Sequence, residues 1–167
     1  LGMAGGFIFL LSLLPLPAFT GTTSHPCGTP LAGILLGPGV ASGLAFLSLL
    51  LQAAFFAHGG FSSLGANTLS LGLLGAGTAW LVYKGLRVVR APVWAAGAAA
   101  GLLGDAAVYA GTGGLLGFHL AHFAPQPQYD LAGYLKVIYL AYLPTQGPIA
   151  LGEAAVTGWA LHAIGRQ

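Results

Sequence analysis

Apolar residues form long runs in this chain, separated by short clusters of glycine, proline and polar residues. A run of about 20 apolar residues can cross the hydrocarbon core of a bilayer as a helix. The turn residues leave five candidate spanning helices, at 2–19, 38–57, 64–83, 92–119 and 131–162. The pattern therefore predicts an all-α protein, a polytopic transmembrane helical bundle.

A further apolar segment, within HPCGTPLAGILLGPG, is too short for an ordinary span. It is bracketed by Pro26 and Pro30 on one side and by Pro38 on the other. A half-length helix is tolerated at membrane depth only where its backbone is buried in protein or lines a cavity, as in transporter binding sites. We therefore expect the binding site here. Counted as a crossing, the segment brings the predicted total to six.

Composition indicates that lipid is the solvent. Of the 167 residues, 56% are hydrophobic and only 5% are charged, and the mean hydropathy is +0.84. So little charge cannot keep a globule of this size dispersed in water. The five Lys and Arg residues form no patch, which argues against a nucleic-acid partner.

The basic residues also predict an orientation. Lys84, Arg87 and Arg90 follow the 64–83 run, and Arg166 lies near the C-terminal end. The positive-inside rule places both regions on the cytoplasmic side. Counting crossings back from there puts His25 on the external side.

The same count puts Leu1 inside. The chain opens within an apolar run and not on methionine, so we expect a preceding helix, which would make seven crossings and bring the N-terminus outside. No linker divides residues 1–167. The prediction is one transmembrane domain that is incomplete at its N-terminus.

Four histidines fall at helix ends on the predicted external side: His25, His58, His119 and His122. Imidazole is the commonest protein ligand for borderline transition metals. His25 could bind a metal or hydrogen-bond an unpaired backbone group. His58 precedes two glycines and fits a helix end. His119 and His122 share a helix face and could chelate a metal, but an interfacial location explains them equally well.

Two other polar residues are close to these histidines in sequence. Cys27 could add a soft ligand, although a lone cysteine in an apolar chain is more often a small core residue. Asn67 stands near the start of the 64–83 span, where it could cap the helix or orient an imidazole.

Asp105 and Glu153 fall inside predicted spans, where an ionised carboxylate is costly unless it is paired, protonated or hydrated. On the predicted topology neither lies beside the external histidines. We expect pairing between helices, or docking of a partner subunit, and not metal ligation. Pro144 and Pro148 should kink the last span and free carbonyls that Gln146 could satisfy.

Small residues spaced four apart favour close helix packing in lipid. The candidate pairs are Gly33 with Gly37, Gly72 with Ala76, and Gly97 with Gly101. The chain contains no GxxxxGK[ST] loop to cradle ATP and no GxSxG nucleophile elbow. Any transport work must therefore be powered by another subunit.

Three stretches, GTTSHPCGTPLAGILLGP, AHGGFSSLGANT and PTQGPIALGE, occur in this order. They resemble CbiM, the substrate-specific component of energy-coupling-factor cobalt transporters, with the nickel component NikM a near neighbour. The resemblance implies seven helices and an N-terminal Met-His that enters the bundle from outside and supplies amine, amide and imidazole nitrogens. The histidine of the SHP motif, His25 here, completes that metal site. His58 and Asn67 match motif positions without a ligand role, and Cys27 replaces an expected threonine, which argues against an essential thiolate.

The resemblance also implies a non-catalytic, multi-pass subunit of a bacterial or archaeal plasma membrane. It would capture Co2+ on the external side for ATP-driven uptake that supplies cobalamin biosynthesis. Its partners would be a CbiN-type small membrane subunit, a CbiQ-type coupling subunit and a CbiO-type ATPase. No prosthetic group is expected, since Co2+ or Ni2+ is the transported substrate. The alternatives are the same role for nickel, a membrane metalloenzyme, or a structural subunit whose histidines only cap and hydrogen-bond.

Overall fold

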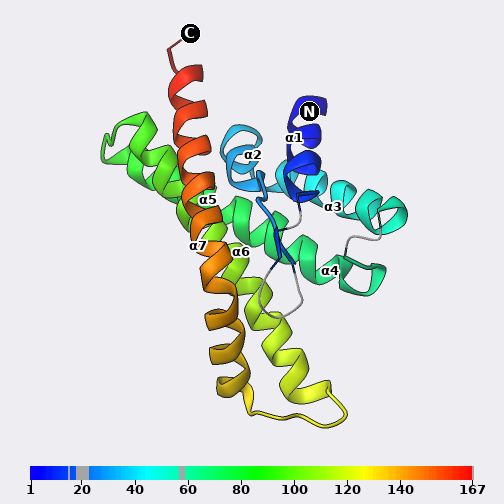
Figure 1. Cartoon of the computed structure of the whole chain (residues 1–167). Helices are drawn as coiled ribbons and strands as arrows, with labels where there is room; N and C mark the ends of the chain where they lie inside the picture. The colour runs from blue at the N-terminus through cyan, green and yellow to red at the C-terminus, as the bar shows by residue number, and fades with distance from the viewer. Residues whose placement is uncertain (15, 18–22, 57–58, 167) are drawn as a thin grey trace.

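The computed structural model describes residues 1–14, 16–17, 23–56 and 59–166 (Figure 1). Within these ranges the protein is helical apart from one antiparallel pair of two-residue strands, β1 (Leu16–Pro17) and β2 (Thr23–Ser24). The predicted all-α class is therefore confirmed. Six helical segments are described: α1 (Gly2–Ser12), α2 (Thr29–Leu36), α3 (Pro38–Phe55), a continuous stretch made of η1 (Phe61–Ser63), α4 (Leu64–Asn67), η2 (Thr68–Gly75) and α5 (Ala76–Val88), then α6 (Val93–Phe123) and α7 (Leu131–Ile164).

The first predicted helix was too long. The run 2–19 contains α1, which ends at Ser12 and is followed by the short strand β1. Residues 15–17 read Pro-Leu-Pro. Proline has no amide hydrogen for the helix ladder and disfavours helical geometry at the residue before it, so an apolar run need not be one helix.

Two of the described helices, α3 and α6, are long and apolar enough to cross a membrane by length and composition. Large apolar side chains also point outward, with Phe55, Val88 and Trp159 between 73% and 82% exposed. An outer surface of this kind suits a protein whose solvent is lipid. The count of six crossings stays a prediction.

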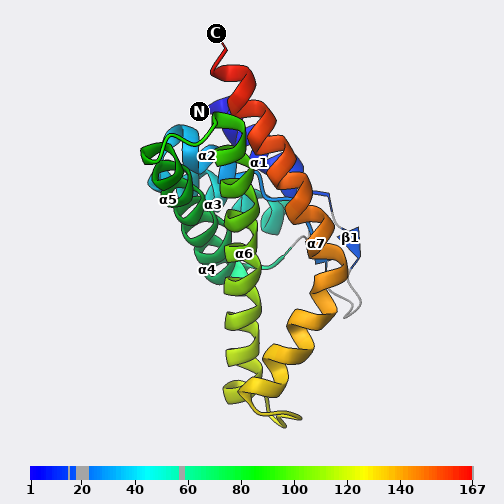
Figure 2. The same ribbon diagram turned by 90° about the vertical axis from the view of Figure 1, so that its left-hand side faces the viewer.

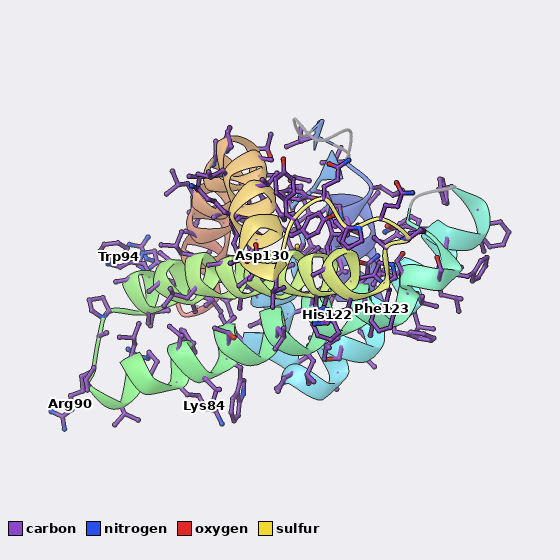
Figure 3. All side chains as sticks on the ribbon, turned by 90° about the horizontal axis from the view of Figure 1, so that it is seen from below. Lys84, Arg90, Trp94, His122, Phe123 and Asp130 are labelled. Carbon is purple, nitrogen blue, oxygen red and sulfur yellow. The ribbon has the colours of Figure 1, made fainter. Side chains whose placement is uncertain are left out.

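Helices α6 and α7 form a long antiparallel pair, joined by the loop 124–130 (Figures 1 and 2). Both chain ends and the α5–α6 turn lie at the opposite end of the molecule from that loop (Figures 1 and 2). Seen end-on, Lys84 and Arg90 project from the outer edge, while His122 and Phe123 lie at the far end of α6 (Figure 3). Helix α7 changes direction midway (Figure 2), and Pro144 and Pro148 lie inside it.

The short helix α2 lies within the bundle and contacts α3, α5, α6 and α7. Its eight residues begin after Gly28, whose φ of 66° is in the left-handed region, and end at Gly37, with φ of 87°. The first part of α2 is therefore buried in protein, as the sequence predicts, whereas Leu35 near its end is 47% exposed.

Small residues allow the close approaches of these helices. A Cβ on Gly33 would lie 2.6 Å from the Ala76 carbonyl oxygen, and one on Gly101 would lie 2.7 Å from the Glu153 carbonyl oxygen. The predicted packing role of Gly37 is wrong, because an added Cβ there would meet no described atom within 4 Å. Gly37 is instead the left-handed residue that separates α2 from α3.

We predict that Gly101→Ala destabilises the protein by about 1–3 kcal/mol, because the new methyl group forces α6 away from the α7 backbone. Gly77→Ala is the matched control, since a Cβ there meets no described atom within 4 Å and alanine is the better helix former. Thermal unfolding in detergent measures both. Equal unfolding temperatures for the two variants would contradict the tight α6–α7 contact.

Candidate functional site

A cavity of about 340 Å³ lies beside the loop that leads into α2. Residues from this loop, from α3 and the following helical stretch, and from α6 and α7 enclose it. Its walls are mixed, with apolar side chains, hydroxyl groups, one imidazole and two side-chain amides. The lining residues are Ser24, His25, Cys27, Leu49, Gly59, Ser63, Asn67, Leu71, Val108, Tyr109, Thr112, Gly113, Tyr142 and Gln146.

Among the described residues, His25 is the histidine that lines this cavity. Its side chain is partly buried, and Nδ1 lies 3.3 Å from the carbonyl oxygen of Pro26. A carbonyl oxygen can only accept, so a hydrogen bond here places the proton on Nδ1. In the neutral ring, the lone pair is then on Nε2, which is the form of histidine that binds metals.

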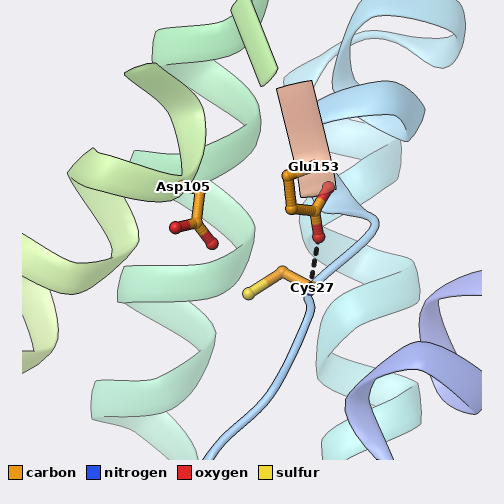
Figure 4. A group of neighbouring side chains, drawn as sticks. All are labelled: Cys27, Asp105 and Glu153. Atoms are coloured by element: carbon orange, nitrogen blue, oxygen red, sulfur yellow. Dashed lines mark hydrogen bonds between the residues drawn. The ribbon is translucent and has the colours of Figure 1, made fainter. Parts of the chain in front are cut away.

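Helix α7 holds the loop on both sides of His25. Before the histidine, the Ser24 hydroxyl lies 3.3 Å from the Thr145 hydroxyl. After it, the backbone N–H of Cys27 donates to Oε1 of Glu153 at 2.5 Å (Figure 4). The backbone N–H of Gly28 donates to the same oxygen at 2.7 Å. The Cys27 thiol also donates to the His25 carbonyl oxygen at 3.7 Å. Helix α7 therefore contacts the loop both before and after His25.

The position of the Glu153 carboxylate differs from the prediction. This carboxylate was expected away from the external histidines, yet it bonds to the amide two residues after His25. Counting membrane crossings predicts the side of the membrane on which each loop lies, but not how deeply a loop enters the bundle. Because α2 begins inside the bundle, the loop before it reaches the level of Glu153.

Asp105 forms the pairing between helices that was predicted. Its Oδ2 accepts a hydrogen bond of 2.7 Å from Nε2 of Gln146, and the residue is fully buried. Gln146 was expected to satisfy carbonyls freed by the prolines, and its amide nitrogen serves this carboxylate instead. The pair ties α6 to the bent part of α7.

Potential metal-ligand atoms of Cys27, Asp105 and Glu153 lie within 4.8 Å of one another, all buried (Figure 4). Within the described ranges this is the one group of three such residues. Oε1 of Glu153 already accepts two amides and Oδ2 of Asp105 accepts one. Through these bonds the two carboxylates anchor the loop and α7, while Oδ1 of Asp105 is buried without a hydrogen-bond partner among the described residues. The cavity around His25 is the candidate metal site that includes a histidine.

The other predicted residues are placed differently. Asn67 lines the cavity and donates to the Ser63 hydroxyl at 3.3 Å, but it does not cap the helix, which already begins at Phe61. His119 is exposed and stacks on Phe123, outside the cavity.

His122 is exposed as well and packs against Phe118 on the same helix. The chelation predicted for His119 and His122 stays a prediction. His58 lies outside the described residues. The loop contacts made by Glu153 and Thr145 could not be read from sequence spacing, although a glutamate inside an apolar span was a signal of a specific role.

Comparison with known proteins adds to this geometry. A family model for CbiM, described as the cobalt uptake substrate-specific transmembrane region, matches residues 1–167. The cobalt transport protein CbiM of Geobacter sulfurreducens is 41% identical over 157 residues, which cover 93% of this chain and 44% of that protein. That of Sorangium cellulosum is 38% identical over 161 residues, covering 96% and 69%.

A crystal structure of a transition metal transporter superposes with a TM-score of 0.86 at 25% identity, covering 98% of this chain and 74% of that one. The chain thus spans less than half of one curated relative and about two thirds of another.

We predict that Gln146→Leu destabilises the protein by about 1–3 kcal/mol, because it leaves the buried Asp105 carboxyl without its amide donor. The double variant Gln146→Leu with Asp105→Leu should recover much of this loss, since both polar partners are then replaced. Chemical unfolding of the two variants checks the coupling. Strictly additive losses would show that the pair does not act as a unit.

Proposed function

The chain belongs to the CbiM family of cobalt uptake membrane proteins, and we propose that it is the substrate-specific subunit that captures Co2+ on the external side of the membrane. The observation that carries this proposal is the position of His25, on the wall of a cavity and on a loop held by α7. A rigid loop suits a metal ligand, because binding then costs little ordering of the chain.

His25 would supply one nitrogen to the ion. The Nδ1 contact with the Pro26 carbonyl favours the tautomer whose Nε2 lone pair can bind a metal. In this proposal the remaining nitrogens come from a Met-His segment ahead of Leu1, carried by a seventh helix. Sequencing the gene upstream of Leu1 tests that part directly.

The type of ligand atom determines only in part which metal ion the protein selects. A nitrogen ligand set suits nickel at least as well as cobalt by intrinsic affinity, so geometry and metal supply must decide between them. We assign cobalt because of the family. Competition between Co2+ and Ni2+ for uptake by the assembled transporter separates the two, and a preference for Ni2+ would reassign the substrate.

Energy for transport would come from outside this chain, which contains no ATP-binding loop. We propose an energy-coupling-factor assembly in the bacterial or archaeal plasma membrane, with a CbiO-type ATPase, a CbiQ-type coupling subunit and a CbiN-type small subunit. The imported cobalt would supply cobalamin biosynthesis. The subunit itself would bind and present the ion without catalysing a reaction.

We predict that His25→Ala in the complete protein reduces cobalt uptake by the assembled transporter at least about tenfold, since metal sites rarely tolerate loss of a ligand. His162→Ala is the matched control, because it removes another imidazole from near the C-terminal end of α7. Radioactive cobalt accumulation in cells measures both variants. Uptake by the His25 variant equal to that of the His162 variant would refute the proposed function.

A further inference from the structure

One carboxylate on α7 accepts two of the hydrogen bonds that hold the loop carrying His25. Glu153 Oε1 accepts from the two consecutive amides that precede α2. Glu153 is 4% exposed, so water contributes little to these bonds. Hydrogen bonds to an ionised acceptor are about twice as strong as neutral ones. Removing this carboxylate would leave the Cys27 and Gly28 amides without their acceptor.

A carboxylate suits this place for a second reason. The N-terminal end of a helix carries a partial positive charge, and α2 begins directly after Gly28. Gly28 can turn left-handed without strain, which lets both its own amide and that of Cys27 point at one oxygen. The negative charge, the helix end and the glycine together fix the direction in which the chain leaves His25.

Glu153 also links the loop to the bend of α7. The two contacts from α7 to the loop, by Thr145 and by Glu153, are separated by eight residues, or about 12 Å of helix. Pro148 lies between them. His25 therefore lies on a loop that is held at two points of one helix. A shift of either point would move the imidazole relative to the cavity walls.

We infer that Glu153 is a positioning residue for metal capture, whose carboxylate sets the orientation of His25 through the Cys27 and Gly28 amides. This inference rests on the proposed function, since it assumes that His25 binds the ion. Glu153 itself does not touch the metal. It acts in the way that partners of metal ligands generally act, by holding a ligand in the geometry that the ion requires.

The experiment measures Co2+ binding to the complete protein in lipid nanodiscs, by calorimetry and by the visible absorption of the bound ion. Glu153→Gln keeps the shape and one acceptor oxygen but removes the charge, and Glu153→Ala removes the acceptor altogether. We expect Co2+ affinity to fall about tenfold for the first and up to about 100-fold for the second. The absorption bands should shift in the glutamine variant, because the ligand geometry changes.

Each substitution is also made in the His25→Ala background. If Glu153 acts through His25, it should then change affinity by less than about twofold. Thr157→Val is the control on the same helix, since the buried Thr157 hydroxyl has no hydrogen-bond partner among the described residues. It should leave Co2+ affinity unchanged. If the alanine variant does not fold, the glutamine variant decides.

Two results would overturn the inference. The first is an equal loss of affinity in both His25 backgrounds. The second is wild-type affinity and absorption in Glu153→Gln while His25→Ala alone weakens binding. If His25→Ala alone leaves Co2+ affinity unchanged, the proposed function fails as well, so the two failures are distinguishable.

Discussion

A loop that enters a membrane bundle to begin a helix must have its backbone amides satisfied by protein, because lipid offers no hydrogen-bond acceptor. In this chain the helix is α2, and the carboxylate of Glu153 accepts the two amides that precede it. The position of the loop, and therefore of His25, follows from that interaction. The cavity lies beside this loop, near the start of the half-length helix.

Burying a carboxylate so deeply is expensive, and the surrounding structure offsets the cost with donors. Glu153 receives two backbone amides, and nearby Asp105 receives the side-chain amide of Gln146. These bonds connect three elements, the loop, α6 and α7. The Cys27, Asp105 and Glu153 side chains lie close together among them (Figure 4). The small residues along α6 make the connection possible, since Gly101 brings the backbone of α6 against that of α7 at Glu153.

Most of the helical architecture could be predicted from sequence, because prolines and glycines bracket the apolar runs. The half-length helix was recognised between Pro30 and Pro38 for this reason, and the structure has it at Thr29–Leu36. The first helix was predicted too long, since hydropathy alone does not register a helix break within an apolar run. His25 was found through its motif, and the structure places it on a cavity wall.

The contacts that support His25 could not be predicted. Glu153 and Cys27 are 126 residues apart in the chain, and no local spacing brings them together. Topological counting assigns each loop to one side of the membrane, but a loop that precedes a half-length helix reaches the interior. Gln146 was linked to the prolines nearest in sequence, whereas its amide nitrogen bonds to Asp105 on another helix.

The most direct test of His25 as a ligand of the ion is the X-ray absorption spectrum of the complete protein loaded with Co2+. A first shell of nitrogen ligands is predicted, with an imidazole contribution that decreases when His25 is replaced by alanine. A sulfur atom from Cys27 in the first shell, or a spectrum that the replacement of His25 does not change, would contradict it.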